Sequence, residues 1–262
     1  MAKLSISKAW DETREVLKRD GRLLSIVAIA LLALPSTVQN LVTPTVAPGE
    51  LPPPGIWLIV LLISVLVGIV GQLAIVRLAI GPQTSVGEAI SHGARRVIPY
   101  FAAMLLWVAP LAIAIYFTAQ QMRPPAPSGA MAILFLILLG LMIFVAVRLI
   151  IAVAVASAEP LGPIGILQRS WQLTAGSWWR LFGFLILFLI AVLAVMIAVG
   201  ALVGILVGIV FGAPEPMSVS ALLVALFTQL AVAVVTVVFL VMLARIYTQL
   251  SARNVSVPDT KA

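Results

Sequence analysis

The chain has 262 residues, of which 63% are hydrophobic and only 10% are charged, and its mean hydropathy is +1.20. Because a soluble domain carries about 25% charged residues, this composition places the chain among membrane proteins and excludes an ordinary soluble enzyme. Cysteine is absent, which excludes disulfides, thiol catalysis and cysteine-ligated metals.

Six apolar runs are long enough to cross a bilayer, which needs about 20 residues. They cover residues 23–42, 56–80, 97–119, 130–158, 179–211 and 218–247. The sequence therefore predicts an all-α polytopic membrane protein whose six transmembrane helices form three hairpins with amphipathic helices on the cytoplasmic side. We expect one membrane domain over residues 1–250 and a disordered cytoplasmic tail over residues 251–262.

The net charge of +7 has a one-sided distribution along this topology. Of the 16 basic residues, all except Arg123 fall in the N-terminal leader, the connections 77–97 and 148–180, or the C-terminal part. Since loops rich in Lys and Arg stay in the cytoplasm, both termini are expected to be cytoplasmic. The charge thus indicates sidedness and attraction to anionic lipid headgroups, rather than binding to nucleic acid.

The three connections on the opposite side are rich in proline. Segments 44–55, 123–129 and 212–217 hold ten of the 17 prolines. Because proline fixes φ and lacks a backbone donor, these segments are expected to be short, stiff connectors. Two further prolines, Pro35 and Pro110, lie inside the first and third apolar runs and predict kinks there.

Three polar-faced segments precede the odd-numbered runs. Residues 5–21 place Ile6, Trp10, Thr13 and Leu17 on one helical stripe, Ser85–Glu88 forms a capping-box pattern, and the segment 162–180 carries the stripe Leu167, Trp171, Thr174 and Trp178. Such segments are typical of helices that lie on a membrane surface. The expected interface anchors are Trp10, Arg95, Arg96, Arg169, Trp171, Trp178, Trp179 and Arg180.

The segment 161–182 aligns without a gap on residues 80–101, 81 positions earlier. Each polar-faced segment leads into an outward run, a proline-rich turn and an inward run. This order predicts three repeats, near 5–80, 81–161 and 162–250. The alternative is that the likeness reflects only the amphipathic inner loops common to multi-span proteins.

One stretch carries a recognisable motif. It comprises Glu159 and Gly162–Pro163, then Arg169 to Thr174 with the sequence RSWQLT, and finally Gly176 and Trp179–Arg180. The motif resembles that of the bacterial six-span membrane-domain family named for glycerophosphodiester phosphodiesterases. This resemblance implies a bacterial inner (plasma) membrane location and a six-span fold. Some members of that family join this domain to a catalytic barrel, which the present sequence does not contain.

The residue types needed for hydrolysis are scattered. The chain has nine acidic residues and one histidine, His92. Phosphodiester hydrolysis needs clustered carboxylates, usually with a metal, and an acid–base group. We therefore expect no enzyme activity, no metal and no cofactor, and we interpret His92 as a solvated side chain rather than a ligand or catalytic group.

Polar residues inside the apolar runs are the remaining candidates for function. Arg148 either reaches the inner membrane boundary or, if the repeats superpose, lies near mid-membrane and needs a partner. Glu159 lies about 16 Å further along the same predicted helix, too far to pair without a bend. Gln72 and Gln229 lie in other runs and are alternative partners.

The fifth run carries four glycines at intervals of four residues: Gly200, Gly204, Gly208 and Gly212. Tandem GxxxG spacing leaves one helix face flat, so that another backbone can approach closely. The neighbour is either another helix of the same chain or a second copy in a homo-oligomer.

Two functions follow as hypotheses. The first is a non-enzymatic membrane module that associates with lipid headgroups, or with a membrane or cytoplasmic protein partner, at its cytoplasmic face. The second is a transporter or channel for a small or lipidic solute. A continuous polar cavity that reaches Arg148, Gln72 or Gln229 favours transport, whereas a dry, closed bundle favours the module.

Overall fold

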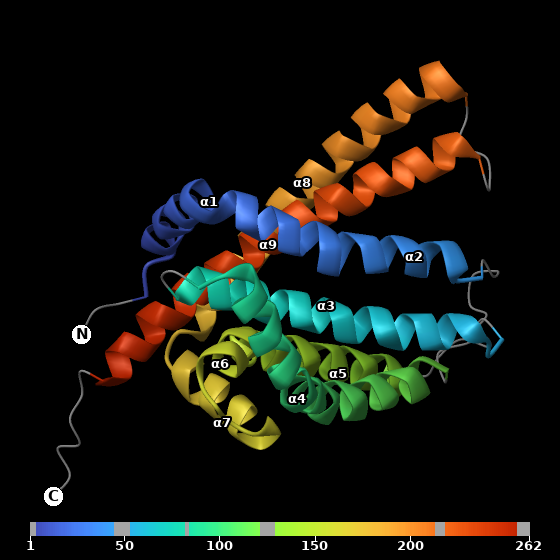
Figure 1. The fold of residues 1–262 in the computed structure, drawn as a ribbon. Coiled ribbons are helices and arrows are strands. Elements are labelled where there is room, and N and C mark those ends of the chain that lie inside the picture. The colour runs from blue at the N-terminus through green and yellow to red at the C-terminus, as the bar shows by residue number, and fades with distance from the viewer. Residues whose placement is uncertain (1–3, 45–52, 82–83, 121–128, 213–217, 256–262) are drawn as a thin grey trace, which may run out of the picture.

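The computed structural model describes residues 4–44, 53–81, 84–120, 129–212 and 218–255 (Figure 1). All secondary-structure elements in this described part are helices. Within it, six helical stretches are long and apolar enough to cross a membrane. The most apolar part of the fifth stretch has no buried residue, as expected for a helix that faces lipid. The predicted all-α polytopic membrane protein is thus confirmed.

The first stretch is continuous from α1 (Ile6–Ala28) through the π-helical segment η1 (Ile29–Ala33) to α2 (Leu34–Val42). Ser5 begins it as the N-cap, since its hydroxyl accepts a hydrogen bond from the backbone N–H of Lys8 at 3.3 Å. The kink predicted at Pro35 stays a prediction, but the π-helical segment η1 ends two residues before this proline. Proline cannot donate to the preceding turn, and a π-bulge is a common accommodation.

The first two polar-faced segments continue into the spans that follow them without a break in the helix. α1 runs through Gly21 without interruption, and α4 (Val86–Gln120) joins the second polar-faced segment to the third apolar run. At both transitions the backbone stays helical. The glycines with positive φ, Gly176 and Gly212, lie elsewhere in the chain. α4 begins with the predicted capping box between Ser85 and Glu88. It bends along its length (Figure 1), and Pro99 and Pro110 lie inside it.

The fourth predicted run, 130–158, is interrupted. The chain forms α5 (Gly129–Arg148), a turn over residues 149–151, and then the short α6 (Ala152–Ala158). The break lies at the basic end of the span, just after Arg148. A turn and the short helix α6 therefore separate Glu159 from α5.

The third polar-faced segment forms a separate helix, α7 (Pro163–Thr174), as expected. Pro163 occupies its first turn, where the missing N–H removes no helical hydrogen bond. Gly176 has φ of 75° in the short connection to α8 (Trp178–Phe211). This left-handed conformation ends α7 and favours glycine.

The core is built from the returning helices. α3 (Ile56–Ile80) and α9 (Val219–Val255) each follow a proline-rich connection, and their later turns are almost fully buried together with α6. Helices approach closely at two glycines. A methyl group on Gly93 would lie 2.7 Å from the carbonyl oxygen of Val70, and one on Gly71 would lie 2.9 Å from the Cβ of Leu31. The repeat into three units stays a prediction.

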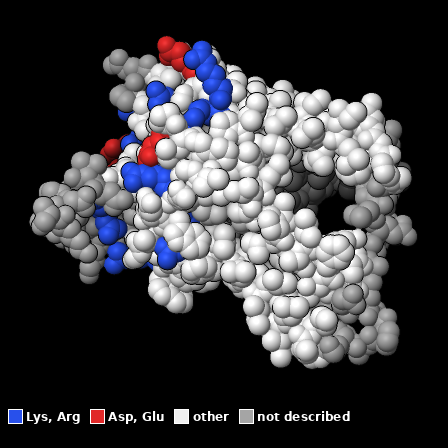
Figure 2. Space-filling model, turned by 90° about the horizontal axis from the view of Figure 1, so that it is seen from below, with Lys and Arg blue, Asp and Glu red and all other residues white. Residues whose placement is uncertain are grey.

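Charged side chains gather at one end of the molecule in the view of Figure 2, the end where Figure 1 marks both chain termini. We call this the basic end. It comprises the beginnings of α1, α4 and α8, the ends of α3, α5, α6 and α9, and all of α7. Most residues of the three proline-rich connections, together with Arg123, lie outside the described residues. α9 extends to Val255, so part of the predicted disordered tail is helical, and residues 256–262 lie outside the described part.

Candidate functional site

α7 packs across the break between α5 and α6. The backbone carbonyl of Arg148, at the end of α5, accepts hydrogen bonds from the hydroxyls of Ser170 at 3.1 Å and Thr174 at 2.9 Å. The last carbonyls of a helix lack intrahelical partners, and within a membrane each must find another donor. The two hydroxyls of α7 therefore stabilise the break by satisfying this carbonyl.

The side chain of Arg148 lies among aromatic rings. Its guanidinium carbon is 5.1 Å from the centre of the Trp171 ring and 5.6 Å from that of Phe144. The Nε and Nη1 atoms are buried and make no hydrogen bond within the described part of the chain, which leaves Nη2 as the accessible nitrogen. Cation–π contacts offset part of the cost of desolvating a guanidinium, but they supply no counter-charge.

Glu159 does not pair with Arg148. Its carboxylate accepts hydrogen bonds from the Nε of Arg169 at 3.0 and 3.1 Å and from the hydroxyl of Tyr247 at 2.9 Å. These contacts join the residue after α6 to α7 and to α9. The acidic residue nearest in sequence to Arg148 is thus already occupied.

The carbonyl groups at the end of α6 are satisfied by side chains of α4. Arg96 donates from Nε to the carbonyl of Ala156 at 3.0 Å and from Nη2 to that of Glu159, while the Nε2 of His92 donates to the carbonyl of Ser157 at 2.8 Å. His92 therefore donates a structural hydrogen bond that the sequence did not predict, although its side chain stays partly exposed. A cation at this position also complements the negative end of the helix dipole.

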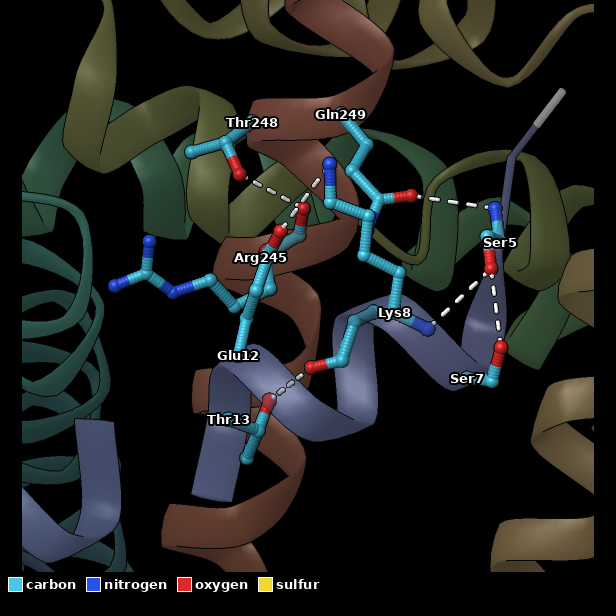
Figure 3. A network of polar contacts seen from close by, with 9 residues as sticks. Ser5, Ser7, Lys8, Glu12, Thr13, Arg245, Thr248 and Gln249 are labelled. Carbon is cyan, nitrogen blue, oxygen red and sulfur yellow. Dashed lines mark hydrogen bonds and ion pairs between the residues drawn. The ribbon is translucent and has the colours of Figure 1, made fainter. Parts of the chain in front are cut away.

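The ends of α1 and α9 meet at a second junction (Figure 3). Gln249 accepts a hydrogen bond from the backbone N–H of Ser5 at 3.2 Å, which attaches the beginning of α1 to α9. Arg245 donates from Nη2 to the carbonyl of Ala79, at the end of α3, at 2.6 Å. Arginine therefore satisfies carbonyl groups at the ends of both α3 and α6.

The predicted interface anchors fall into two groups. Arg96 and Arg169 are half-buried and engaged inside the protein, as described above. Trp171 stacks on Arg148, and Trp178 donates from Nε1 to the carbonyl of Phe144 at 3.3 Å. The remaining four expected anchors are exposed: Trp10, Arg95, Trp179 and Arg180.

A polar hollow of about 550 Å³ lies beside the beginning of α4. Arg77 and Arg95 line it together with Glu88 and His92. The Glu88 carboxylate accepts hydrogen bonds from the N–H and the hydroxyl of Ser85, both at 2.9 Å, and no salt bridge joins it to either arginine. The hollow thus presents two guanidinium groups at the basic end.

Gln72 and Gln229 do not contact Arg148. Both line a cavity of about 360 Å³ between α2, α3 and α9, in the membrane-crossing part of the molecule. The described lining of this cavity does not include Arg148. Glutamine and hydroxyl side chains give this mostly apolar cavity some of the polar character that the transport hypothesis requires, but none of its described lining residues lies at the basic end.

The four glycines of α8 have no close neighbour within the described chain. A methyl group built on Gly200, Gly204, Gly208 or Gly212 would meet no atom within 4 Å outside its own turn of the helix. Gly212 has φ of 83° and caps the end of α8. Close packing of this face against another helix of the same chain is therefore absent from the described part.

Sequence reasoning missed two of the groups that organise the basic end. Tyr247 was taken only as the end of the sixth run, and Ser170 only as part of the RSWQLT motif. The signal that could have found Ser170 and Thr174 is their spacing of four residues, which places two hydroxyls on one side of α7. Nothing local marks Tyr247, because its partner lies 88 residues away.

The fold and the junctions at the basic end define a polytopic helical membrane protein whose helix ends are held by arginine and hydroxyl side chains. A family model described as a domain of unknown function (DUF7847) matches residues 4–250, and the chain belongs to this family. No curated protein and no solved structure matches the chain.

Proposed function

We propose that the protein is a non-enzymatic membrane module that binds anionic lipid headgroups at its basic end, with that end in the cytoplasm of a bacterial cell and the spans in the inner membrane. The observation that carries this proposal is the environment of Arg148. Its guanidinium lies against two aromatic rings, no carboxylate of the described residues pairs with it, and one nitrogen remains accessible. A lipid phosphate supplies the missing counter-charge and accepts charge-assisted hydrogen bonds.

Two further features support a headgroup-binding role. The polar hollow that contains Arg77 and Arg95 offers a second cationic surface at the same end. Exposed tryptophans such as Trp179, with 77% of its surface accessible, suit the headgroup level of a bilayer. The motif of α7 also supports a distant relationship to the six-span phosphodiesterase-associated membrane domains, which we propose on the residues 159–180 alone.

The test is lipid retention. The protein is reconstituted with equal amounts of phosphatidylglycerol and phosphatidylethanolamine, extracted in mild detergent, and analysed by native mass spectrometry. We expect the wild type to retain phosphatidylglycerol preferentially and Arg148→Gln to retain several-fold less. Arg14→Gln, which removes one exposed positive charge from α1, is the matched control and should retain as much as the wild type. Equal retention by Arg148→Gln and the wild type would overturn the proposal.

A variant that conserves the charge separates headgroup binding from folding. Arg148→Lys keeps a cation in the same place, so it should retain phosphatidylglycerol better than Arg148→Gln even where both lower thermal stability. If Arg148→Lys and Arg148→Gln are equally stable and retain equally little phosphatidylglycerol, the positive charge at position 148 does not bind the lipid.

Transport of a small or lipidic solute is the second candidate function. The cavity lined by Gln72 and Gln229 favours it, because polar side chains are expensive inside a membrane and usually serve function. Flux of a labelled uncharged lipid between the leaflets of proteoliposomes, compared with protein-free vesicles, tests this candidate. Equal rates in the two preparations would exclude it for that solute.

A further inference from the structure

The cavity between α2, α3 and α9 contains three glutamine side chains: Gln39, Gln72 and Gln229. Gln72 lies 16 residues after the first residue of α3, about 24 Å at 1.5 Å per residue, and Gln229 lies 10 residues into α9, about 15 Å. Since a hydrocarbon core is about 30 Å thick, both amides lie well inside the membrane.

The hydroxyl groups around the cavity already have partners. Ser36 and Thr236 each donate to the carbonyl four residues earlier in their own helix, both at 2.8 Å, and Ser64 donates to the carbonyl of Pro35 at 3.2 Å. The hydroxyls therefore need no ligand as donors.

The amides differ from these hydroxyls. The side chains of Gln39, Gln72 and Gln229 make no hydrogen bond within the described part of the chain. Each amide offers two donor hydrogens and an acceptor oxygen, and leaving these groups unpaired inside a membrane is strongly unfavourable. The two unpaired amides inside the membrane, Gln72 and Gln229, therefore favour a hydrogen-bonding guest in this cavity.

The chemistry of the cavity excludes a charged guest. All of its described lining residues are uncharged, so an ion would enter a low-dielectric site without a counter-charge. The guest must instead be neutral and rich in hydroxyl, amide or carbonyl groups. The volume of about 360 Å³ is within the usual range for small-molecule sites.

An apolar groove adjoins the cavity. It lies between α8 and α9, has a volume of about 310 Å³, and is lined by side chains such as Phe188, Met196 and Phe239. Val232 and Thr236 line both the groove and the cavity. A polar site and a hydrocarbon-lined site therefore meet at one turn of α9.

We propose that the cavity and the groove together bind one uncharged lipid. Its hydroxyl-bearing head forms hydrogen bonds with Gln72 and Gln229, and one hydrocarbon chain lies in the groove against Phe188 and Phe239. The site is separate from Arg148 and does not depend on headgroup binding at the basic end.

Competition between lipids in native mass spectrometry tests this site. Dioleoylglycerol is the uncharged probe and phosphatidylglycerol the charged comparison. Gln72→Met combined with Gln229→Met keeps the side-chain volumes and removes both amides. We expect this double variant to retain about tenfold less dioleoylglycerol, the loss of roughly one or two net hydrogen bonds, while its retention of phosphatidylglycerol stays at the wild-type level.

The groove is tested separately by Val192→Trp, which fills it and should also lower dioleoylglycerol retention. Gln168→Met, on the exposed face of α7, is the matched control and should change neither lipid. Soluble glycerol serves as a third probe. If glycerol shifts the thermal midpoint of the wild type but not of the double variant, while dioleoylglycerol is not retained, the guest is a solute from water and the lipid proposal is overturned.

A third outcome identifies water as the occupant. In that case neither probe is retained and the double methionine variant is more stable than the wild type, because two unpaired amides have been removed; the proposal then fails. Arg148→Gln in the same assay keeps the two proposals distinct, since it should lower phosphatidylglycerol retention and leave dioleoylglycerol retention intact.

Discussion

The hydroxyl of Thr174 donates a hydrogen bond to the backbone carbonyl of Arg148 at 2.9 Å, although 26 residues separate them in the chain. This bond connects the motif helix α7 to the end of α5. Together with the neighbouring bond from Ser170, it explains why the motif contains hydroxyl residues at a spacing of four. The motif forms the packing surface for the α5–α6 break.

Replacing Thr174 by valine should destabilise the protein by about 1–2 kcal/mol, because the carbonyl of Arg148 loses one of its two donors. The same hydroxyl also lies 2.8 Å from the carbonyl of Ser170 in its own helix, so the loss must be compared with that of a purely intrahelical threonine bond. Thermal unfolding in detergent, followed by circular dichroism, measures the change. Thr118→Val is the matched control, since the Thr118 hydroxyl donates only to Ala114 of its own helix. An equal loss of stability in Thr174→Val and Thr118→Val would show that the hydrogen bond to Arg148 does not stabilise the protein beyond an intrahelical bond.

The ion pair between Glu159 and Arg169 should show measurable coupling. We expect Glu159→Gln to cost about 1–3 kcal/mol, because a half-buried guanidinium and the Tyr247 hydroxyl both lose a charged acceptor. A double-mutant cycle with Arg169→Gln should give a coupling energy of about 1 kcal/mol. Glu88→Gln, combined with Arg169→Gln in a second cycle, is the control and should give no coupling energy. A coupling energy of zero for Glu159 and Arg169 would show that their ion pair does not stabilise the protein.

Gly93 should not tolerate alanine. The added methyl group would lie 2.7 Å from the backbone oxygen of Val70, so α3 and α4 must move apart. The expected loss is about 1–3 kcal/mol, as for overpacking in a core. Gly87→Ala, in the same helix, meets no atom within 4 Å and should instead gain a few tenths of a kcal/mol to about 1 kcal/mol from helix propensity. Chemical unfolding measures the change in unfolding free energy for both variants. Changes of the same sign in the two variants would contradict the prediction.

The glycine face of α8 should tolerate alanine in the monomer. Gly204→Ala introduces a methyl group into open space, so thermal stability of a detergent-solubilised monomer should be unchanged or slightly raised. The sequence left open whether this face packs within the chain or against a second copy. Size-exclusion chromatography with light scattering tests for the contact with a second copy. A shift from a larger species in the wild type to a monomer in Gly204→Ala would assign the face to a contact between copies.

Single-cysteine labelling tests the proposed orientation, and the absence of native cysteine makes the background clean. Cysteines at the exposed positions Gln168 and Gln172 should react with a membrane-impermeant maleimide only in inside-out vesicles. A cysteine at Gly129, at the opposite end, should react only in right-side-out vesicles. The reverse pattern would place the basic end outside the cytoplasm.

The sequence by itself determined the class of the protein and the approximate spans. Long apolar runs must be helical in a bilayer, since helices satisfy their own backbone groups, and α3 matches its predicted bounds of 56–80. The capping box at Ser85 was likewise readable, because its partners lie three residues apart. Local patterns of this kind need no knowledge of the rest of the fold.

Only the tertiary structure decided which polar groups meet. Periodicity placed Trp171 and Arg169 on opposite sides of a surface helix, but it could not show that one stacks on Arg148 and the other binds Glu159. It could not bring Gln72 of α3 and Gln229 of α9 to one cavity either. These contacts join residues far apart in the chain, and they depend on the break at residues 149–151 and on how the spans pack. The break and the packing of the spans depend on which carbonyl groups find hydrogen-bond donors and on how side chains fill the space between helices. These contacts involve the whole bundle, so the sequence of a single segment does not determine them.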